Sequence, residues 1–295
     1  VGQEQTVDLV LTAILANGHV LIEGVPGVAK TLLARLTARL IDADFSRVQF
    51  TPDLMPSDVL GTTVFNMKTN GFDFHQGPIF ADIVLVDEIN RAPAKTQAAL
   101  FEVMEERQIS IDGTTHRMGD LYTILATQNP VEQEGTYKLP EAQLDRFLMK
   151  ITMDYPSLEE EVNILERHHT NAALVKLDDI TPAITKEELL SLRAFMNQVF
   201  VDRTLLQYIA LIVQQTRTSK AVYLGASPRA SVAMLQSSKA YALLQGRDFV
   251  TPEDIKFVAP YVLQHRLILT AEAEMEGYSP VKVTQRLIDK VEVPK

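Results

Sequence analysis

The stretch of sequence that decides the fold covers residues 19–31 and has the sequence HVLIEGVPGVAKT. Its first part is an apolar run rich in β-branched side chains, which predicts a buried strand. Two glycines then lead into Lys30 and Thr31, where leucines begin to recur at helical spacing. A strand that passes through a glycine-rich turn into a helix is a structure in which backbone N–H groups surround phosphate. We therefore predict a phosphate-binding loop of the Walker A type at 24–31.

Each part of this loop has an expected role in binding Mg-ATP. Gly24 and Gly27 are expected to let the backbone turn tightly, so that its N–H groups point at phosphate oxygens. Lys30 adds a compact positive charge on the terminal phosphates, and the hydroxyl of Thr31 is expected to ligate Mg²⁺. The strict pattern has glycine at the position of Ala29, which we expect to accommodate its methyl group in an ordinary right-handed helical conformation. The predicted nucleotide contacts in the loop are Gly24, Val25, Pro26, Gly27, Val28, Ala29, Lys30, Thr31 and Leu32.

A second motif ends the apolar run at 83–86, which predicts a buried strand followed directly by Asp87 and Glu88. Adjacent residues at the end of a strand point in different directions, so the two carboxylates can have separate roles. Asp87 is expected to hold the Mg²⁺ shell, while Glu88 polarises the attacking water. An acidic strand end alone is usually a solvated cap. Downstream of a phosphate-binding loop, it predicts a Walker B motif.

Short apolar runs alternate with helical segments between residues 9 and 150, which predicts an α/β domain with a five-stranded parallel sheet. Crossover helices are expected at 30–40 and 95–106. Two hairpins are inserted into this scheme, because Asn70-Gly71 and Asp112-Gly113 are both favoured in two-residue turns. Strands are predicted at 19–23, 47–50, 83–86, 123–127 and 147–151, with hairpin arms at 64–68, 72–75, 108–111 and 114–117.

Beyond Pro156 only helical segments are expected, so an all-α lid domain follows the sheet domain. Thr185, Ser227 and Thr251 each offer an N-cap, and proline follows the last two at the first helical position. We predict a nucleotide-binding domain at 1–155, a linker at 156–184 and a helical lid at 185–295. The predicted helices cover 158–168, 186–199, 203–218, 228–244 and 252–269.

Composition excludes several classes of protein. Apolar residues make up 46% and charged residues 22% of the chain, which is typical of a folded globular protein. The net charge of −10 argues against a broad nucleic-acid-binding face, because such contacts depend on clustered Lys and Arg. No apolar run approaches the ~18 residues of a membrane span, and we find no signal-peptide pattern. With no cysteine, disulfides and thiolate metal sites are excluded, and we expect a cytoplasmic protein.

With both motifs in place, the chain resembles an AAA+ ATPase. The sequence DEINRA at 87–92, together with the loop at 24–31, resembles the MoxR family, and the resemblance covers nearly the whole length. Residues 1–4 resemble the opening segment of that family near the adenine, which implies a nucleotide contact at Gly2. The segment at 126–130 resembles sensor 1, which implies that Asn129 positions the attacking water beside Glu88.

Two arginine motifs extend the resemblance. The segment LDRF at 144–147 resembles the arginine-finger segment, in which Arg146 would reach the γ-phosphate bound by a neighbouring subunit. The segment GASPRA at 225–230 resembles sensor 2, which implies that Arg229 contacts the phosphates from the first turn of a lid helix. In isolation Arg146 could be a surface arginine in a salt bridge. Arg91 and Arg107 could also face an interface, and the sequence does not rank them.

The resemblance implies ATP and Mg²⁺ as cofactors, a homo-hexameric ring, and a chaperone-type action on a protein client. Proteins that carry a von Willebrand factor type A domain are candidate clients. The ribbon at 64–75 is expected to face the pore or an upper surface of the ring, where it would meet the client. Surface decoration is the alternative for this ribbon.

Three other functions stay open at this point. A magnesium-chelatase-type motor subunit, which couples ATP hydrolysis to metal insertion into a porphyrin, also resembles this chain. A nucleic-acid motor is disfavoured by the net charge and by hairpin tips that carry no cation, although Lys68, His116 and Arg117 flank them. A scaffold that binds ATP without turnover is disfavoured by Glu88, Asn129 and Arg146.

Overall fold

The computed structural model describes residues 2–130, 135–169 and 179–293. The chain forms two compact units, and we describe each by itself. The first consists of Val1–Glu4, His19–Leu139 and Thr152–Leu190, and the second of Gln5–Gly18, Pro140–Ile151 and Ser191–Lys295. None of the described helices has the length and apolarity needed to cross a membrane.

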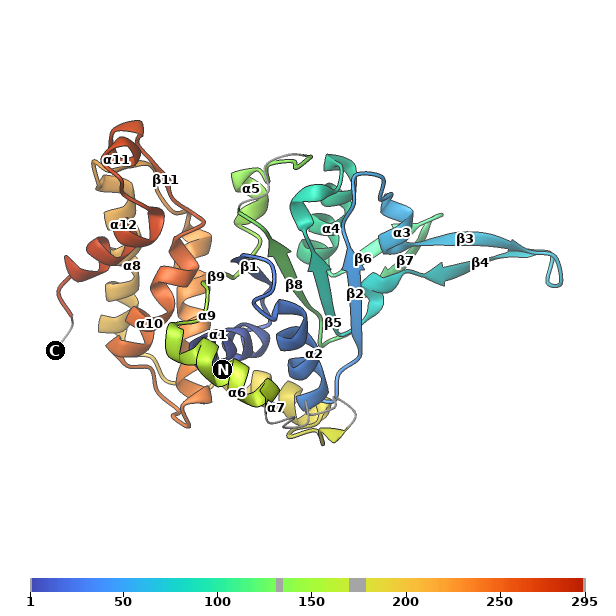
Figure 1. Cartoon of the computed structure of the whole chain (residues 1–295), viewed down its shortest axis with the longest axis horizontal. Helices are drawn as coiled ribbons and strands as arrows, with labels where there is room; N and C mark the ends of the chain where they lie inside the picture. The colour runs from blue at the N-terminus through green and yellow to red at the C-terminus, as the bar shows by residue number, and fades with distance from the viewer. Residues whose placement is uncertain (1, 131–134, 170–178, 294–295) are drawn as a thin grey trace. The chain divides into compact units, whose positions relative to one another are not determined.

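A five-stranded sheet forms the core of the nucleotide-binding part, with the strand order β2-β5-β8-β1-β9 (Figure 1). The strand β5 pairs in parallel with β2 and β8, and β1 pairs in parallel with β8. Every residue of β5 is buried. The α/β prediction with five strands is therefore confirmed, with strand ends displaced by one to a few residues. The strands are β1 (Val20–Gly24), β2 (Phe45–Gln49), β5 (Ile83–Asp87), β8 (Thr123–Gln128) and β9 (Met149–Met153).

Helices connect these strands as expected. The helix α2 (Lys30–Leu40) buries the small residues Ala34, Thr37 and Ala38, which lets it pack closely on β5. The helix α4 (Ala94–Glu106) is joined to β8 by His19, whose Nδ1 accepts a hydrogen bond from Ile124 N at 3.0 Å. Its Nε2 donates to the carbonyl oxygen of Met104 at 3.1 Å. The other helices in this unit are the short α3 (Pro56–Leu60), η1 (Pro78–Phe80) and η2 (Ile89–Arg91) and the longer α6 (Leu158–His169).

Two hairpins extend from this unit. The strands β6 (Gln108–Ile111) and β7 (Thr114–Arg117) pair so that Ile111 faces Thr114, which confirms the two-residue turn at Asp112-Gly113. Both turn residues have positive φ, 49° and 78°.

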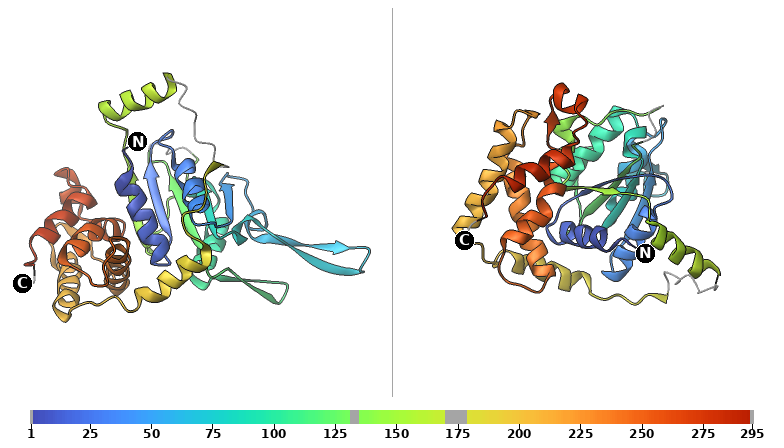
Figure 2. Two further views of the ribbon diagram at one scale, coloured as in Figure 1. Left: turned by 90° about the horizontal axis from the view of Figure 1, so that it is seen from below. Right: turned by 60° about the vertical axis from the view of Figure 1, so that its left-hand side comes forward.

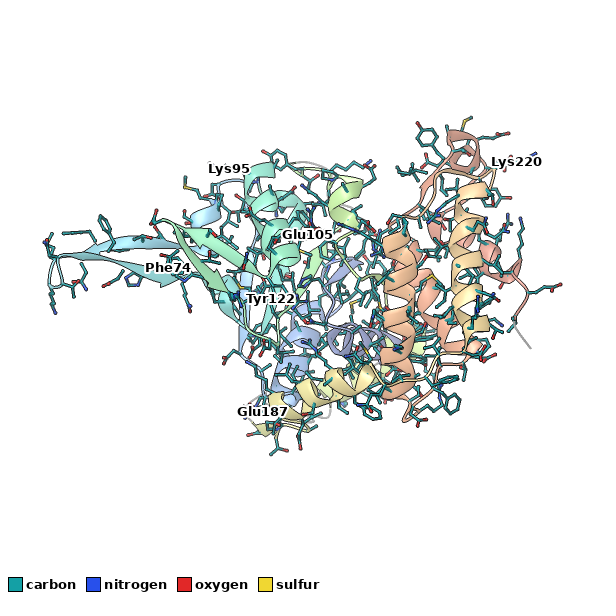
Figure 3. All side chains as sticks on the ribbon, turned by 180° about the vertical axis from the view of Figure 1, so that it is seen from behind. Phe74, Lys95, Glu105, Tyr122, Glu187 and Lys220 are labelled. Carbon is teal, nitrogen blue, oxygen red and sulfur yellow. The ribbon has the colours of Figure 1, made fainter. Side chains whose placement is uncertain are left out.

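The other hairpin differs from the prediction. In the ribbon of β3 (Gly61–Asn66) and β4 (Gly71–Gln76), Asn66 pairs with Gly71, so the turn spans residues 67–70 and is not the expected two-residue turn at Asn70-Gly71. Asn70 does have positive φ, 48°, but Gly71 belongs to the strand. The ribbon projects away from the sheet (Figure 1 and Figure 2). Phe74, labelled in Figure 3, lies against His116 with ring centroids 4.2 Å apart and the rings tilted by 33°.

The second unit is helical, as predicted for the lid, with one exception. The helix expected at 252–269 ends at Leu263, and Ile268–Leu269 instead forms a short strand, β11, that pairs antiparallel with β10 (Val222–Leu224). At the centre, α9 packs against α8 and α10. The helices assigned mainly to this unit are α1 (Glu4–Leu15), α5 (Glu141–Leu144), α7 (Lys186–Met196), α8 (Arg203–Thr218), α9 (Pro228–Leu244), α10 (Pro252–Leu263), α11 (Ala271–Met275) and α12 (Pro280–Asp289).

The side chain makes a capping hydrogen bond at two of the three expected N-caps. The Thr251 side chain caps α10 in a reciprocal capping box with Asp254, and Thr185 makes the same exchange with Glu188. Ser227 occupies the N-cap of α9 as predicted, but its side chain makes no capping bond. Its hydroxyl instead donates to Asp145 Oδ2 at 3.2 Å.

A buried histidine follows α10 directly. The side chain of His265 is buried, and its Nε2 donates to the carbonyl oxygen of Phe147 at 3.1 Å. Burial, reinforced by the neighbouring Arg266 cation, holds the pKa of His265 well below its usual range. The imidazole is therefore neutral in the folded protein at pH 7, while the unfolded chain takes up a proton near pH 6.5.

We expect this difference to make the lid unit less stable in mild acid. Above pH 6.5 the free energy of unfolding does not change with the titration of His265. As pH falls from there towards the lowered pKa, the free energy of unfolding decreases by at most about 1.4 kcal/mol per pH unit. In His265→Gln, which keeps a donor for Phe147, the urea midpoint should fall less steeply between pH 7.5 and 5.5. The exposed His75→Gln is the control, and identical slopes for all three proteins would contradict the expectation.

Candidate active site

The predicted phosphate-binding loop connects the end of β1 to the start of α2. Gly27 has φ 88°, and a Cβ added there would meet nothing within 4 Å, so the loop needs glycine for its backbone conformation. Gly24 has a different role from the one expected. A Cβ at Gly24 would lie 2.7 Å from the carbonyl oxygen of Met153, so glycine is required by the close approach of β9 and not by a tight turn.

The conformation of Ala29, the last residue before α2, corrects a second expectation. Ala29 has φ 61° and ψ 27°, so it is left-handed and not right-handed as expected. A non-glycine residue in this region costs on the order of 1–3 kcal/mol. The chain needs this conformation to pass from the loop into α2, which explains why the strict pattern has glycine here. The strain at Ala29 is held by the strand and helix on either side.

The loop and the first turn of α2 present groups that suit a polyphosphate. Ala29 provides no side-chain cap, and the first turn contains no acidic residue. Such a helix start offers N–H groups and the positive end of the helix dipole. Lys30 lies across the loop, with its Nζ donating to the carbonyl oxygen of Gly24 at 2.6 Å. Positive charge and backbone donors therefore meet in one place.

Asp87 ends β5 and is held on both carboxylate oxygens. It is only 7% exposed. Its Oδ2 accepts a hydrogen bond from Arg47 Nε at 2.6 Å, in an ion pair across the β2–β5 ladder. Its Oδ1 accepts from the hydroxyl of Thr127 at 3.1 Å. The carboxylate is thus fixed in orientation by one residue from each neighbouring strand.

Glu88 follows with a different backbone conformation and different partners. Its φ of 57° and ψ of 51° are left-handed, which is uncommon for glutamate and is found mostly where structure enforces it. Its N–H donates to the Thr127 hydroxyl at 3.0 Å. Its Oε2 accepts from Gln49 Nε2 at 2.8 Å and from Arg91 Nη1 at 2.9 Å. The two adjacent carboxylates are therefore directed to separate places.

The parallel sheet brings most of the predicted site to one edge. The loop follows β1, Asp87 and Glu88 lie at the end of β5, and Asn129 directly follows β8, which lies between them in the sheet. Asn129 is buried, and Thr31 is half-buried in the first turn of α2. In parallel sheets ligands bind outside the carboxyl ends of the strands, so these residues occupy the expected edge.

Three predicted residues lie elsewhere. Gly2 has φ 73° and lies against the carboxylate of Glu160, which a Cβ would displace. Arg146 follows α5 and Arg229 is in the first turn of α9, and both belong to the lid unit. The roles predicted for these three residues stay predictions.

Sequence reasoning missed three residues that hold the acidic pair: Arg47 and Gln49 on β2, and Thr127 on β8. The only available signal was the polar alternation in β2, since nothing local reveals which strand lies next to β5. The two unranked arginines are now distinguished. Arg91 pairs with Glu88 at 2.9 Å, whereas Arg107 donates to the carbonyl oxygen of Tyr122 at 3.2 Å inside the unit.

Comparison with known proteins agrees with this geometry. Residues 19–149 match the family described as "ATPase family associated with various cellular activities (AAA)", and residues 214–289 match the AAA lid domain. The solved structure of a candidate ATPase from Cytophaga hutchinsonii is 42% identical, with a TM-score of 0.91, and the match covers all of this chain and 91% of that one.

Three relatives match over most of their own length. The protein YeaC of Bacillus subtilis is 48% identical over all of this chain and 91% of its own length. Chaperone MoxR1 of Mycobacterium tuberculosis is 44% identical over all of this chain and 79% of its own. Protein MoxR of Methylorubrum extorquens is 30% identical over 93% of this chain and 86% of its own. The chain belongs to the MoxR family of AAA+ ATPases and is an ATP-hydrolysing enzyme.

The residues present fit Mg-ATP. Within the described ranges, no cluster of three or more His, Cys, Asp or Glu side chains is placed to hold a metal ion by itself. Mg²⁺ suits a site with few protein oxygens, because it keeps several waters and takes the rest of its ligands from substrate phosphates. The hydroxyl of Thr31 and the carboxylate of Asp87 are the oxygen donors at this edge that would hold it.

We expect Thr127 to position the acidic pair. Thr127→Val leaves the Glu88 N–H without its acceptor and Asp87 without one donor, so kcat for ATP should fall by about 10- to 100-fold. The matched control is Thr123→Val on the same strand, because the buried Thr123 hydroxyl has no partner among the described residues. ATP turnover by the two purified variants decides the matter, and equal turnover would refute the positioning role.

Proposed function

We propose that this protein is a Mg-dependent, ring-forming AAA+ ATPase of chaperone type, which uses ATP hydrolysis to remodel or activate a protein partner. The observation that carries the proposal is the shared edge of β1, β5 and β8, where a phosphate-binding loop lies beside two separately oriented carboxylates. A scaffold without turnover would have no use for a strained glutamate in this position.

The residues divide the reaction among them. The loop N–H groups and Lys30 bind the β- and γ-phosphates, and Thr31 and Asp87 would hold Mg²⁺, which would neutralise charge that develops on the transferring phosphate. Glu88 and Asn129 orient the water. As the water oxygen bonds to the γ-phosphorus, the bond to the bridging oxygen breaks, and the water proton passes towards Glu88. Gly2 contacts the adenine.

Ring formation completes the site. Arg146 is proposed to act in trans on the γ-phosphate bound by the next subunit, and Arg229 in cis on the phosphates of its own subunit. A homo-hexamer supplies each site with both arginines. We also keep the domain limits of 1–155 and 185–295, with a linker between them, and a cytoplasmic location, which the lack of cysteine supports.

The ribbon β3–β4 is the proposed contact with a protein client. Phe65 and Phe72 face each other across the ribbon with ring centroids 5.2 Å apart, yet Phe72 is 73% exposed and Met67 in the turn is 89% exposed. Exposed aromatic and methionine side chains on a projecting element suit a protein partner. The chaperone relative from Mycobacterium tuberculosis supports this class, and a protein with a von Willebrand factor type A domain is the candidate client.

Two other functions are weaker. A metal-insertion motor of the magnesium-chelatase type would use the same site, and its client distinguishes it. A nucleic-acid motor is disfavoured by the net charge of −10. Turnover stimulated by DNA and weakened steeply by salt would favour the nucleic-acid alternative.

Mixing inactive subunits tests the ring. Arg146→Ala should lower kcat by about 10³-fold or more, and Glu88→Gln should bind ATP but not hydrolyse it. A mixture should regain phosphate release, because an intact Glu88 site then receives Arg146 from its neighbour. Lys30→Ala, which loses nucleotide binding, is the control. A mixture no more active than its components would leave a self-contained ATPase without a shared site.

A second test concerns the ribbon. Phe65→Ser with Phe72→Ser should leave basal ATP turnover unchanged, because both side chains lie on a projecting ribbon away from the site. Stimulation by a von Willebrand factor type A protein should disappear. The control pair is Thr62→Ser with Asn66→Ser on the opposite face of the ribbon. Full stimulation of the aromatic variant would rule out the ribbon as the client contact.

A further inference from the structure

A buried arginine in the lid unit holds the segment that contains Arg146. The side chain of Arg266 is only 4% exposed, and its Nε donates to Asp145 Oδ1 at 2.6 Å in an ion pair. Its Nη2 donates to the carbonyl oxygens of Asp145 and Phe147 at 3.1 and 2.7 Å. Arg266 therefore fixes the backbone on both sides of Arg146.

The remaining donors of this guanidinium are also used. Nη1 donates to the carbonyl oxygen of Leu148 at 3.1 Å and to that of Val262. Five hydrogen bonds match the five N–H groups of a guanidinium, a geometry that lysine cannot reproduce. The preceding residues assist, because His265 donates to Phe147 and Gln264 Nε2 donates to the carbonyl oxygen of Lys150 at 2.5 Å.

Stability alone does not explain such a contact. A buried ion pair gains little over well-packed apolar residues, because both charges lose their hydration. What the pair does provide is a defined geometry for the groups that it joins. The segment at 145–148, between α5 and β9, is short and irregular, so these side-chain contacts add to its few backbone turn bonds in fixing the position of Arg146.

The same carboxylate reaches the helix that contains Arg229. Asp145 Oδ2 accepts a hydrogen bond from the Ser227 hydroxyl at 3.2 Å, and Ser227 gives up the capping bond that its position at the start of α9 would allow. Arg229 lies in the first turn of that helix. Burial lowers the pKa of Arg266, and the charge of Arg229 is close enough to contribute. Asp145 thus joins the segment of one predicted phosphate-binding arginine to the helix of the other.

We propose that Asp145, held between Arg266 and Ser227, is a positioning residue that makes Arg146 and the start of α9 one rigid body. A displacement of α9 when Arg229 engages the phosphates of its own subunit then moves Arg146 at the neighbouring site. Nucleotide binding in one subunit is transmitted to hydrolysis in the next by this contact. The inference rests on the proposed ring, in which Arg146 acts in trans.

The test asks to which complementation group Asp145 belongs. Asp145→Asn keeps the shape of the side chain and removes its charge, and kcat should fall by about tenfold or more while KM for ATP changes by less than about twofold. Mixed with Glu88→Gln, this variant should regain turnover, because the partner supplies a well-placed Arg146. Mixed with Arg146→Ala it should not, because both proteins lack the same function.

Three further variants guard against a purely structural effect. Ser227→Ala removes only the contact to α9 and should show the same complementation pattern with a smaller loss of kcat, while Ser227→Thr restores the hydroxyl and the activity. Asp254→Asn is the matched control, because Asp254 pairs with Arg247 at 2.5 Å in the same unit and does not touch Asp145. It should keep wild-type turnover.

The outcomes separate the two proposals. If Arg146→Ala and Glu88→Gln do not rescue each other, the shared site fails, and this inference fails with it. If that pair rescues but Asp145→Asn has full activity, or regains turnover when mixed with Arg146→Ala, only the positioning role is overturned. Should Asp145→Asn not fold, the Ser227 variants decide by the same criteria.

Discussion

The pairing of β5 with β8 places the end of one strand beside the end of the other, and the chemistry depends on this register. It sets Thr127 where a single hydroxyl can accept from the N–H of Glu88 and donate to Asp87. Both strands are buried on both faces, so a slip by one residue would exchange the side chains that pack on the two faces of the sheet. The predicted water-positioning Asn129 follows on the same strand.

Two strained residues lie at this edge. Ala29 and Glu88 both adopt left-handed conformations, one at the start of α2 and one directly after β5. Such residues are maintained only where the surrounding structure over-determines them. Rigid strands and a small-residue helix interface provide that support, which keeps the nucleotide-binding residues preorganised and reduces the reorganisation that hydrolysis requires.

The sequence predicted the features whose interacting residues lie close together in the chain. The Asp112-Gly113 turn and the Thr251 capping box were predictable because their partners lie within a few residues. The contact between Ser227 and Asp145 was not, because the two residues lie far apart in the sequence. Arg47 and Gln49 were missed because strand order is a property of the whole sheet. Ala29 was misjudged because its conformation follows from how the loop joins α2, which residue type alone does not reveal.

The β3–β4 ribbon has a consequence for the behaviour of the protein in solution. It is a sheet of two strands, so within the described chain each strand has an outer edge with no other strand beside it. Unpaired N–H and C=O groups on such an edge can accept a further strand from any chain. The ribbon is therefore a place where copies of the chain can pair in concentrated preparations while the core stays folded.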